Sequence, residues 1–172
     1  AHVRAVVRAQ TGVDLEPEVR VLARIELDAL AERFGETAVL TVRDGDEAVA
    51  VDQVVGRAGL LQVNYRTGTR HPLTVAASGR ALLDPGAGVT VSEGELEPGV
   101  RGAAAAVLGT GGQPIASLAV VAPAHRFPPD DEVAAALESA AARGVRCRVL
   151  LDALGSKAFL RTGWPARMRA AG

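Results

Sequence analysis

The chain has 172 residues, the size of one ordinary domain. Apolar residues make up 48% of it and aromatic residues only 3%, so we expect a core of Val, Leu and Ala side chains. Its 19 Lys and Arg residues balance 20 Asp and Glu residues, which excludes a strong attraction to a phosphate backbone. We therefore predict that this chain alone binds DNA weakly or not at all.

The single cysteine, Cys147, cannot form an internal disulfide and favours a reducing, cytoplasmic location. No apolar stretch in the sequence is long enough to span a bilayer. The start, Ala1 to Arg4, has neither an initiator Met nor a signal-peptide pattern. We expect residues 1–16 to be the end of a linker or an N-terminal extension of a longer protein.

The first predicted element is an amphipathic helix over residues 17–34. Its apolar positions recur at a spacing of about 3.6 residues, and Gly35 follows as a stop signal. A hairpin comes next, with strands at 39–43 and 48–55. Asp44-Gly45 between them supplies the positive φ that a tight turn requires.

Alternating residues at 60–65 predict a third strand, and residues 67–72 read as a loop. A short helix rich in Ala, Ser and Gly is expected from Leu73 to Leu83. Asp84-Pro85-Gly86 ends that helix.

Residues 89–93 predict another strand, and 103–108 with 114–122 predict a second hairpin about Gly109 to Gly112. A final helix is expected from Glu132 to about Leu151, interrupted by Gly144 and capped by Asp130-Asp131. Because hairpins join the strands, the fold class is α+β, with helices packed on an antiparallel sheet.

Three segments in order resemble the effector-binding domain of IclR-type bacterial transcription regulators. They are residues 36–54, residues 68–83, and residues 95–102 continuing through 112–123. The resemblance covers about residues 20–154. It implies a GAF-like antiparallel sheet, a small organic effector, assembly into dimers or tetramers, and an N-terminal winged helix-turn-helix that binds DNA. We accordingly assign residues 17–154 to the effector-binding domain and 155–172 to a basic tail, the winged helix being absent from this chain.

One junction departs from the family pattern. Relatives usually carry a further helical stretch after the short helix, which commonly closes over the pocket. Here only Asp84 to Ala87 separate Leu83 from the next strand. The resemblance thus supplies no closing element, although a segment missing from this chain would produce the same junction.

The resemblance also implies a set of ligand-binding residues. Ala77 and Ser78, near the start of the short helix, match positions whose backbone N–H groups meet an acid effector. The other positions that it places around the pocket are Ser92, Val100, Gly102, Ala119 and Val121. Because Ala119 and Val121 are apolar where relatives that bind polar acids carry hydroxyl groups, we expect an apolar or aromatic acid. The competing interpretations are tight helix–sheet packing at the small residues and ordinary core at Ala119 and Val121.

Catalytic and metal patterns are absent from the sequence. The three histidines, His2, His71 and His125, have no metal-ligand spacing, and Ser78 lies in no nucleophile-elbow motif. Arg70 and His71 read as solvated loop side chains, and Arg101 as the partner of a surface carboxylate. We expect neither an enzyme nor a cofactor, and we interpret Cys147 as a structural thiol.

The function that these observations favour is effector sensing. Ligand binding would change the geometry of an oligomer and so the placement of its DNA-binding domains. Two alternatives stay open at this stage: a GAF-like sensor with another output, and a small enzyme that uses the same pocket.

Overall fold

The computed structural model describes residues 17–109 and 111–144. One antiparallel sheet of six strands, in the order β3-β2-β1-β6-β5-β4, organises this part of the chain. The elements, in chain order, are α2 (Pro17–Phe34), β1 (Thr37–Asp44), β2 (Glu47–Val54), β3 (Arg70–Pro72), α3 (Ala76–Leu83), η1 (Pro85–Ala87), β4 (Val89–Glu93), β5 (Val100–Leu108), β6 (Pro114–Pro123), η2 (Ala124–Arg126) and α4 (Asp130–Gly144). The expected α+β class with an antiparallel sheet is confirmed.

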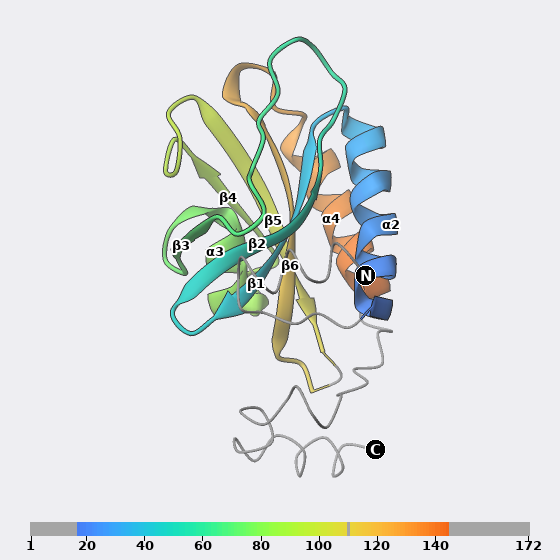
Figure 1. Ribbon diagram of the computed structural model, residues 1–172, viewed down its shortest axis with the longest axis vertical. Coiled ribbons are helices and arrows are strands. Elements are labelled where there is room, and N and C mark those ends of the chain that lie inside the picture. Colours follow the sequence, from blue (N-terminus) through green and yellow to red (C-terminus); the bar gives the residue numbers. More distant parts are fainter. Residues whose placement is uncertain (1–16, 110, 145–172) are drawn as a thin grey trace.

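The two faces of the sheet carry different layers. Helices α2 and α4 lie side by side on one face, and α3 covers the other (Figure 1). Strand alternation sorts the side chains, so Leu40 and Leu118 face α2 and α4, whereas Val39 and Ala119 face α3. Within the described residues the buried hydrophobic side chains are all Leu, Val or Ala, as the composition predicted.

Helix α2 has the predicted bounds, residues 17–34. Leu27, Leu30 and Ala31 are buried against the sheet at helical spacing. Gly35 follows with a φ of +66°, and its N–H donates to the carbonyl of Ala31 at 2.8 Å. A left-handed backbone conformation at this position ends the helix, and glycine adopts it without steric cost.

The predicted hairpin of β1 and β2 is also present, slightly longer than expected. Gly45 supplies the turn with a φ of +62°. The register shifts between Leu40 and Thr41, where β2 carries one extra residue in a β-bulge. The shift moves the pairing partner from Asp52 to Ala50, which brings Ala50 to the face that α3 covers.

The predicted strand at residues 60–65 is wrong. This stretch belongs to a long loop after β2, and its polar backbone groups are paired with side chains. The carbonyl of Val63 accepts from the Thr37 hydroxyl at 2.5 Å, and the N–H of Tyr65 donates to Gln53 Oε1 at 2.9 Å. The third strand is β3, which pairs with β2 and lies within the residues expected to be a loop.

Helix α3 is shorter than predicted, because Leu73 to Val75 form turns and the helix begins at Ala76. The N–H of Val75 donates to the Pro72 carbonyl at 3.0 Å. Ala76 has a φ of +61°, a left-handed conformation that costs a residue with a side chain about 1–2 kcal/mol.

The second half of the sheet follows the prediction closely. Strand β4 has the expected bounds, and the hairpin of β5 and β6 closes through bonds from Gly109 to Gln113 and from Gly112 to Gly109. Helix α4 begins at Asp130, so that Asp130 and Asp131 lie in its first turn, where their charge favours the helix dipole. Predictions for Cys147, the end of the last helix and the basic tail lie outside the described residues.

Candidate functional site

A small cavity lies between α3 and the sheet face that it covers. Its volume is about 30 Å³, room for about two water molecules. We call it the inner cavity. Its lining includes all seven residues expected at a ligand site: Ala77, Ser78, Ser92, Val100, Gly102, Ala119 and Val121. The remaining lining residues are Val39, Thr41, Ala50, Tyr65, Thr69, His71, Ala76, Glu95, Leu96 and Glu97.

The sheet supplies the apolar wall of the inner cavity. Gly102 is paired with Val121 on β5 and β6, and Val39 of β1 is paired with Ala119 of β6. These pairs place short side chains opposite α3. At Gly102 an added Cβ would lie 3.5 Å from the Ser92 hydroxyl, so the small residue keeps this corner open.

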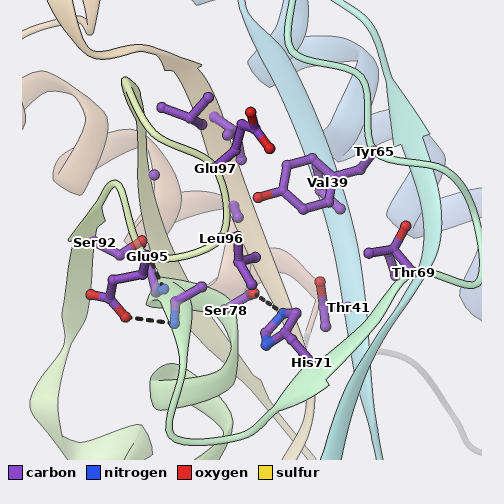
Figure 2. A pocket seen from close by; sticks show the side chains of 17 residues that line it. Val39, Thr41, Tyr65, Thr69, His71, Ser78, Ser92, Glu95, Leu96 and Glu97 are labelled. Atoms are coloured by element: carbon purple, nitrogen blue, oxygen red, sulfur yellow. Dashed lines mark hydrogen bonds between the residues drawn. The ribbon is translucent and has the colours of Figure 1, made fainter.

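Two N–H groups at the start of α3 are already hydrogen-bonded within the chain. The N–H of Ala77 donates to the Ser92 hydroxyl at 3.0 Å, and the N–H of Ala76 donates to Glu95 Oε2 at 2.8 Å (Figure 2). The N–H of Ala77 is therefore already paired in this structure, and the expectation that Ala77 and Ser78 bind an acid stays a prediction. Helix N-termini attract anions, and here a carboxylate of the chain itself takes that place.

Glu95 is held by a second group. Arg80, one turn along α3, donates to Glu95 Oε2 at 2.6 Å and also to the carbonyl of Val91 at 2.7 Å. The Arg80 guanidinium, together with the Ala76 N–H, holds the pKa of Glu95 below its ordinary value. The carboxylate is thus ionised and paired at neutral pH.

His71 and Ser78 form a hydrogen-bonded pair at one end of the cavity. His71 Nδ1 lies 3.0 Å from the carbonyl of Pro72, which can only accept, so Nδ1 carries a proton. Nε2 lies 3.3 Å from the Ser78 hydroxyl and accepts from it when the ring is neutral. The prediction that His71 is a solvated loop side chain is wrong, because it is only 6% exposed. Arg70 beside it is exposed and pairs with Asp44 and Glu47.

Thr41 contributes a buried hydroxyl. The residue is 2% exposed and lines the inner cavity. Its side chain points into the cavity from β1 (Figure 2), and it forms no hydrogen bond within the part of the chain that the structure describes. The hydroxyl oxygen keeps some accessible surface toward the cavity, so this group is available to whatever fills it.

Tyr65 and Glu97 approach the cavity from two different loops (Figure 2). Burial raises the pKa of the Tyr65 hydroxyl, and the charge of Glu97 raises it further. The phenol therefore stays protonated at any physiological pH. Both residues line the inner cavity, so the two can act on the same ligand.

A larger groove continues outward from the inner cavity. This outer groove has a volume of about 510 Å³ and shares five lining residues with the cavity: Tyr65, Thr69, Leu96, Glu97 and Val100. Its other residues come from the loop after β2: Gln62, Val63, Asn64 and Arg66. The volume is in the range of small-molecule sites, whereas the inner cavity admits only a head group.

Several lining residues were not foreseen from the sequence. Thr41 could have been found, because strand alternation places it on the same face as Val39. Tyr65, Leu96 and Glu97 lie on loops that only the tertiary fold brings to the cavity, and they carry no local signal. Arg101, in contrast, pairs with Asp130 at 2.7 Å and Glu93 at 3.7 Å, as predicted for a surface carboxylate partner.

Metal chemistry has no support in residues 17–109 and 111–144, where no cluster of three or more His, Cys, Asp or Glu side chains could hold an ion. No helix of the described chain is long and apolar enough to cross a membrane. The cavity thus offers hydrogen-bonding groups, carboxylates and an apolar wall.

The family model described as the C-terminal domain of bacterial IclR transcriptional regulators matches residues 15–87. That match includes α2, the first hairpin and α3. Over these residues the chain is similar to the IclR-type C-terminal domain. The family match agrees with the resemblance seen in the sequence and supports an effector-binding regulatory domain of a transcription regulator.

Solved structures share the fold over most of the IclR-type domain. IclR of Thermotoga maritima matches with a TM-score of 0.70 and 21% identity, over 83% of this chain and 70% of that one. The C-terminal domain of a transcriptional regulator from Vibrio cholerae matches with a TM-score of 0.62 and 25% identity, over 72% and 94%. These likenesses confirm the GAF-like arrangement of one antiparallel sheet with helices on its faces.

A short segment of the chain is similar to a different class of protein. Cardiolipin synthase A of Proteus mirabilis is 60% identical over 42 residues, which are 24% of this chain and 9% of the synthase. Because the match spans so little of the synthase, it does not establish an enzyme. The family match is instead to a transcriptional regulator.

Proposed function

We propose that this domain senses a small organic molecule bound in the inner cavity and the outer groove. The observation that carries the proposal is the convergence of seven predicted residues from α3 and three strands on one cavity, with a buried hydroxyl at Thr41 that lacks a partner. A site of this kind, apolar with a few polar groups, is typical of small-molecule recognition. An effector would place its head group in the cavity and its body in the groove.

The output that we propose is altered DNA binding by an N-terminal winged-helix domain outside this sequence. Binding would favour one arrangement of a dimer or tetramer over another, which requires different affinities for the two. We further propose that the protein works in the cytoplasm. Sedimentation of the chain as a monomer at high concentration would count against self-association through this domain.

The test of the site is steric. Ala119 is 3% exposed and lies in the apolar wall, so Ala119→Phe should fill the cavity. Thermal stabilisation by a panel of organic amines, amides and acids reports affinity through linkage. A compound that stabilises the original chain should stabilise folded Ala119→Phe at least tenfold more weakly, as estimated from lost contact and overpacking.

The matched control is Ala135→Phe, at an exposed position on α4. It adds the same side chain away from the cavity and should leave the response unchanged. An equal response of Ala119→Phe and Ala135→Phe would mean that the effector binds elsewhere.

A further inference from the structure

We propose that the effector is an amine, a molecule whose head group is cationic, rather than a carboxylic acid. This inference rests on the proposed function, because it takes the inner cavity as the effector site. It departs from the acid expected from the sequence, and the charges and hydrogen bonds around the cavity are the reason.

The charged side chains that line the inner cavity are carboxylates. They belong to Glu95 and Glu97, and no Lys or Arg is among the lining residues. Arg80 neutralises Glu95 at 2.6 Å, whereas Glu97 forms no ion pair within the described residues. Glu97 is exposed to solvent, so its charge is partly screened, and its sign disfavours an acid and favours a cation at the edge of the cavity.

Two of the three N–H groups at the start of α3 that could hold an acid, those of Ala76 and Ala77 but not that of Ser78, are already used. Ala76 N–H donates to Glu95 and Ala77 N–H donates to Ser92. A carboxylate effector that uses either of these two N–H groups would have to displace its acceptor. Displacing Glu95 would also break its pair with Arg80 and leave a second negative charge near the ligand.

The Thr41 hydroxyl points to a ligand independently of the carboxylates. It is buried and unpaired within the described chain, and it is directed into the cavity (Figure 2). Its oxygen can accept a hydrogen bond from an ammonium or amide N–H. Both ring nitrogens of His71 are already hydrogen-bonded, to the Pro72 carbonyl and the Ser78 hydroxyl, so Thr41 is the acceptor at this end of the cavity.

Tyr65 and the outer groove could bind the ammonium group and the apolar body of an amine. An ammonium group over the face of a tyrosine ring gains a cation–π interaction, and Glu97 lines the same cavity and groove as Tyr65. An apolar body would lie along Val63, Leu96 and Val100 in the outer groove. Arg66 also lines that groove, so the preference for positive charge applies to the head group and not to the distal end of the ligand.

The experiment compares three compounds with one skeleton: 3-phenylpropylamine, 3-phenylpropanamide and 3-phenylpropionic acid. Each is titrated against the 172-residue chain at pH 7 in low salt, with thermal stabilisation as the readout. We expect the amine to bind about threefold to fivefold more tightly than the acid, with the amide between them, from one solvent-exposed charge contact. An acid that binds as tightly as the amine, or an amine that binds no more tightly than the amide, would overturn the inference.

Two variants identify the groups responsible. Glu97→Gln should remove most of the advantage of the amine over the amide, while Glu132→Gln, at an exposed carboxylate on α4, should leave it intact. Thr41→Val should weaken the binding of both the amine and the amide. If Glu97→Gln still binds the amine more tightly than the amide by the same factor, Glu97 is not the group that selects the amine.

The failure of this inference can be told apart from failure of the proposed function. Tight binding of the acid that Ala119→Phe abolishes would keep the site and overturn only the charge preference. No stabilisation by any of the three compounds, or stabilisation that persists in Ala119→Phe, would count against both.

Discussion

Glu95 and Ala76 are joined by a hydrogen bond of 2.8 Å between a carboxylate oxygen and a backbone N–H at the first residue of α3. Nineteen positions of sequence separate the two residues. The bond connects the loop between β4 and β5 to the helix that covers the cavity. It also satisfies a helix N-terminus that the sequence left open for an external anion.

The Glu95 contact predicts a specific pH dependence of stability. Because the pKa of Glu95 is lowered in the folded chain, its contribution is complete above the unfolded pKa of about 4.3 and is lost as the pH falls through the folded value. We expect Glu95→Gln to destabilise the domain by about 1 kcal/mol at pH 7 and by much less at pH 3. Urea denaturation at both pH values measures this, with Glu132→Gln as control. A difference that grows toward low pH would contradict the pairing.

A second ion pair should contribute more. Glu36 is 4% exposed, and Arg126 donates to its two oxygens at 2.8 and 3.1 Å and also to the carbonyl of Leu61. Removing Arg126 leaves a buried carboxylate without compensation, so Arg126→Ala should cost about 2–3 kcal/mol. Arg24→Ala, which breaks an exposed pair with Asp28, should cost under about 0.5 kcal/mol. Equal losses in urea denaturation would show that burial of Glu36 does not matter.

The position of α3 depends on Gly79. A Cβ added there would lie 2.6 Å from the carbonyl oxygen of Leu73, a backbone atom that cannot move without moving the chain. Gly to Ala within a helix ordinarily stabilises by about 1 kcal/mol, so a loss at Gly79→Ala would reverse the usual sign. We expect a loss of about 2 kcal/mol from overpacking, and little change for Gly86→Ala, whose Cβ meets only the Asp84 carboxylate at 3.4 Å. Stabilisation by Gly79→Ala would disprove the close contact.

Removal of two hydroxyl groups on buried residues should affect stability to different extents. The Ser117 hydroxyl, on a residue that is 0% exposed, donates to the carbonyl of Ser78 at 3.1 Å. Ser117→Ala should therefore cost about 1–2 kcal/mol, because the carbonyl loses its donor. Thr41→Val should change stability by less than about 0.5 kcal/mol, since the hydroxyl forms no bond within the described fold. A large loss for Thr41→Val would reveal a structural role in place of a ligand-binding one.

Much of the fold could be predicted where local signals and burial agree. The bounds of α2 follow from helical periodicity and from Gly35, and β4 follows from alternation between two turns. The strand expected at 60–65 fails because alternation gives no information about a partner. Leu60 and Leu61 are exposed there, and the backbone pairs with side chains of β1 and β2.

Some features of the candidate site could likewise be predicted from the sequence and others could not. Alternation and family likeness place Ala119 and Val121 on the cavity wall, and both line it. The sequence could not show that Glu95 would occupy the start of α3, because that bond depends on how the loop after β4 folds back. The acid expected from unpaired N–H groups thus stays a prediction, whereas the apolar wall of the cavity could be read from strand positions.

The central claim is that the effector binds in the inner cavity, and amide chemical-shift mapping by NMR tests it most directly. A compound that stabilises the chain would be titrated into the isotopically labelled protein. We predict that the largest shifts occur at Thr41, Ala77, Ser92, Gly102 and Ala119, which line the cavity. Largest shifts at Leu27, Val133 and Leu137, in the core between the opposite sheet face and helices α2 and α4, would contradict the account.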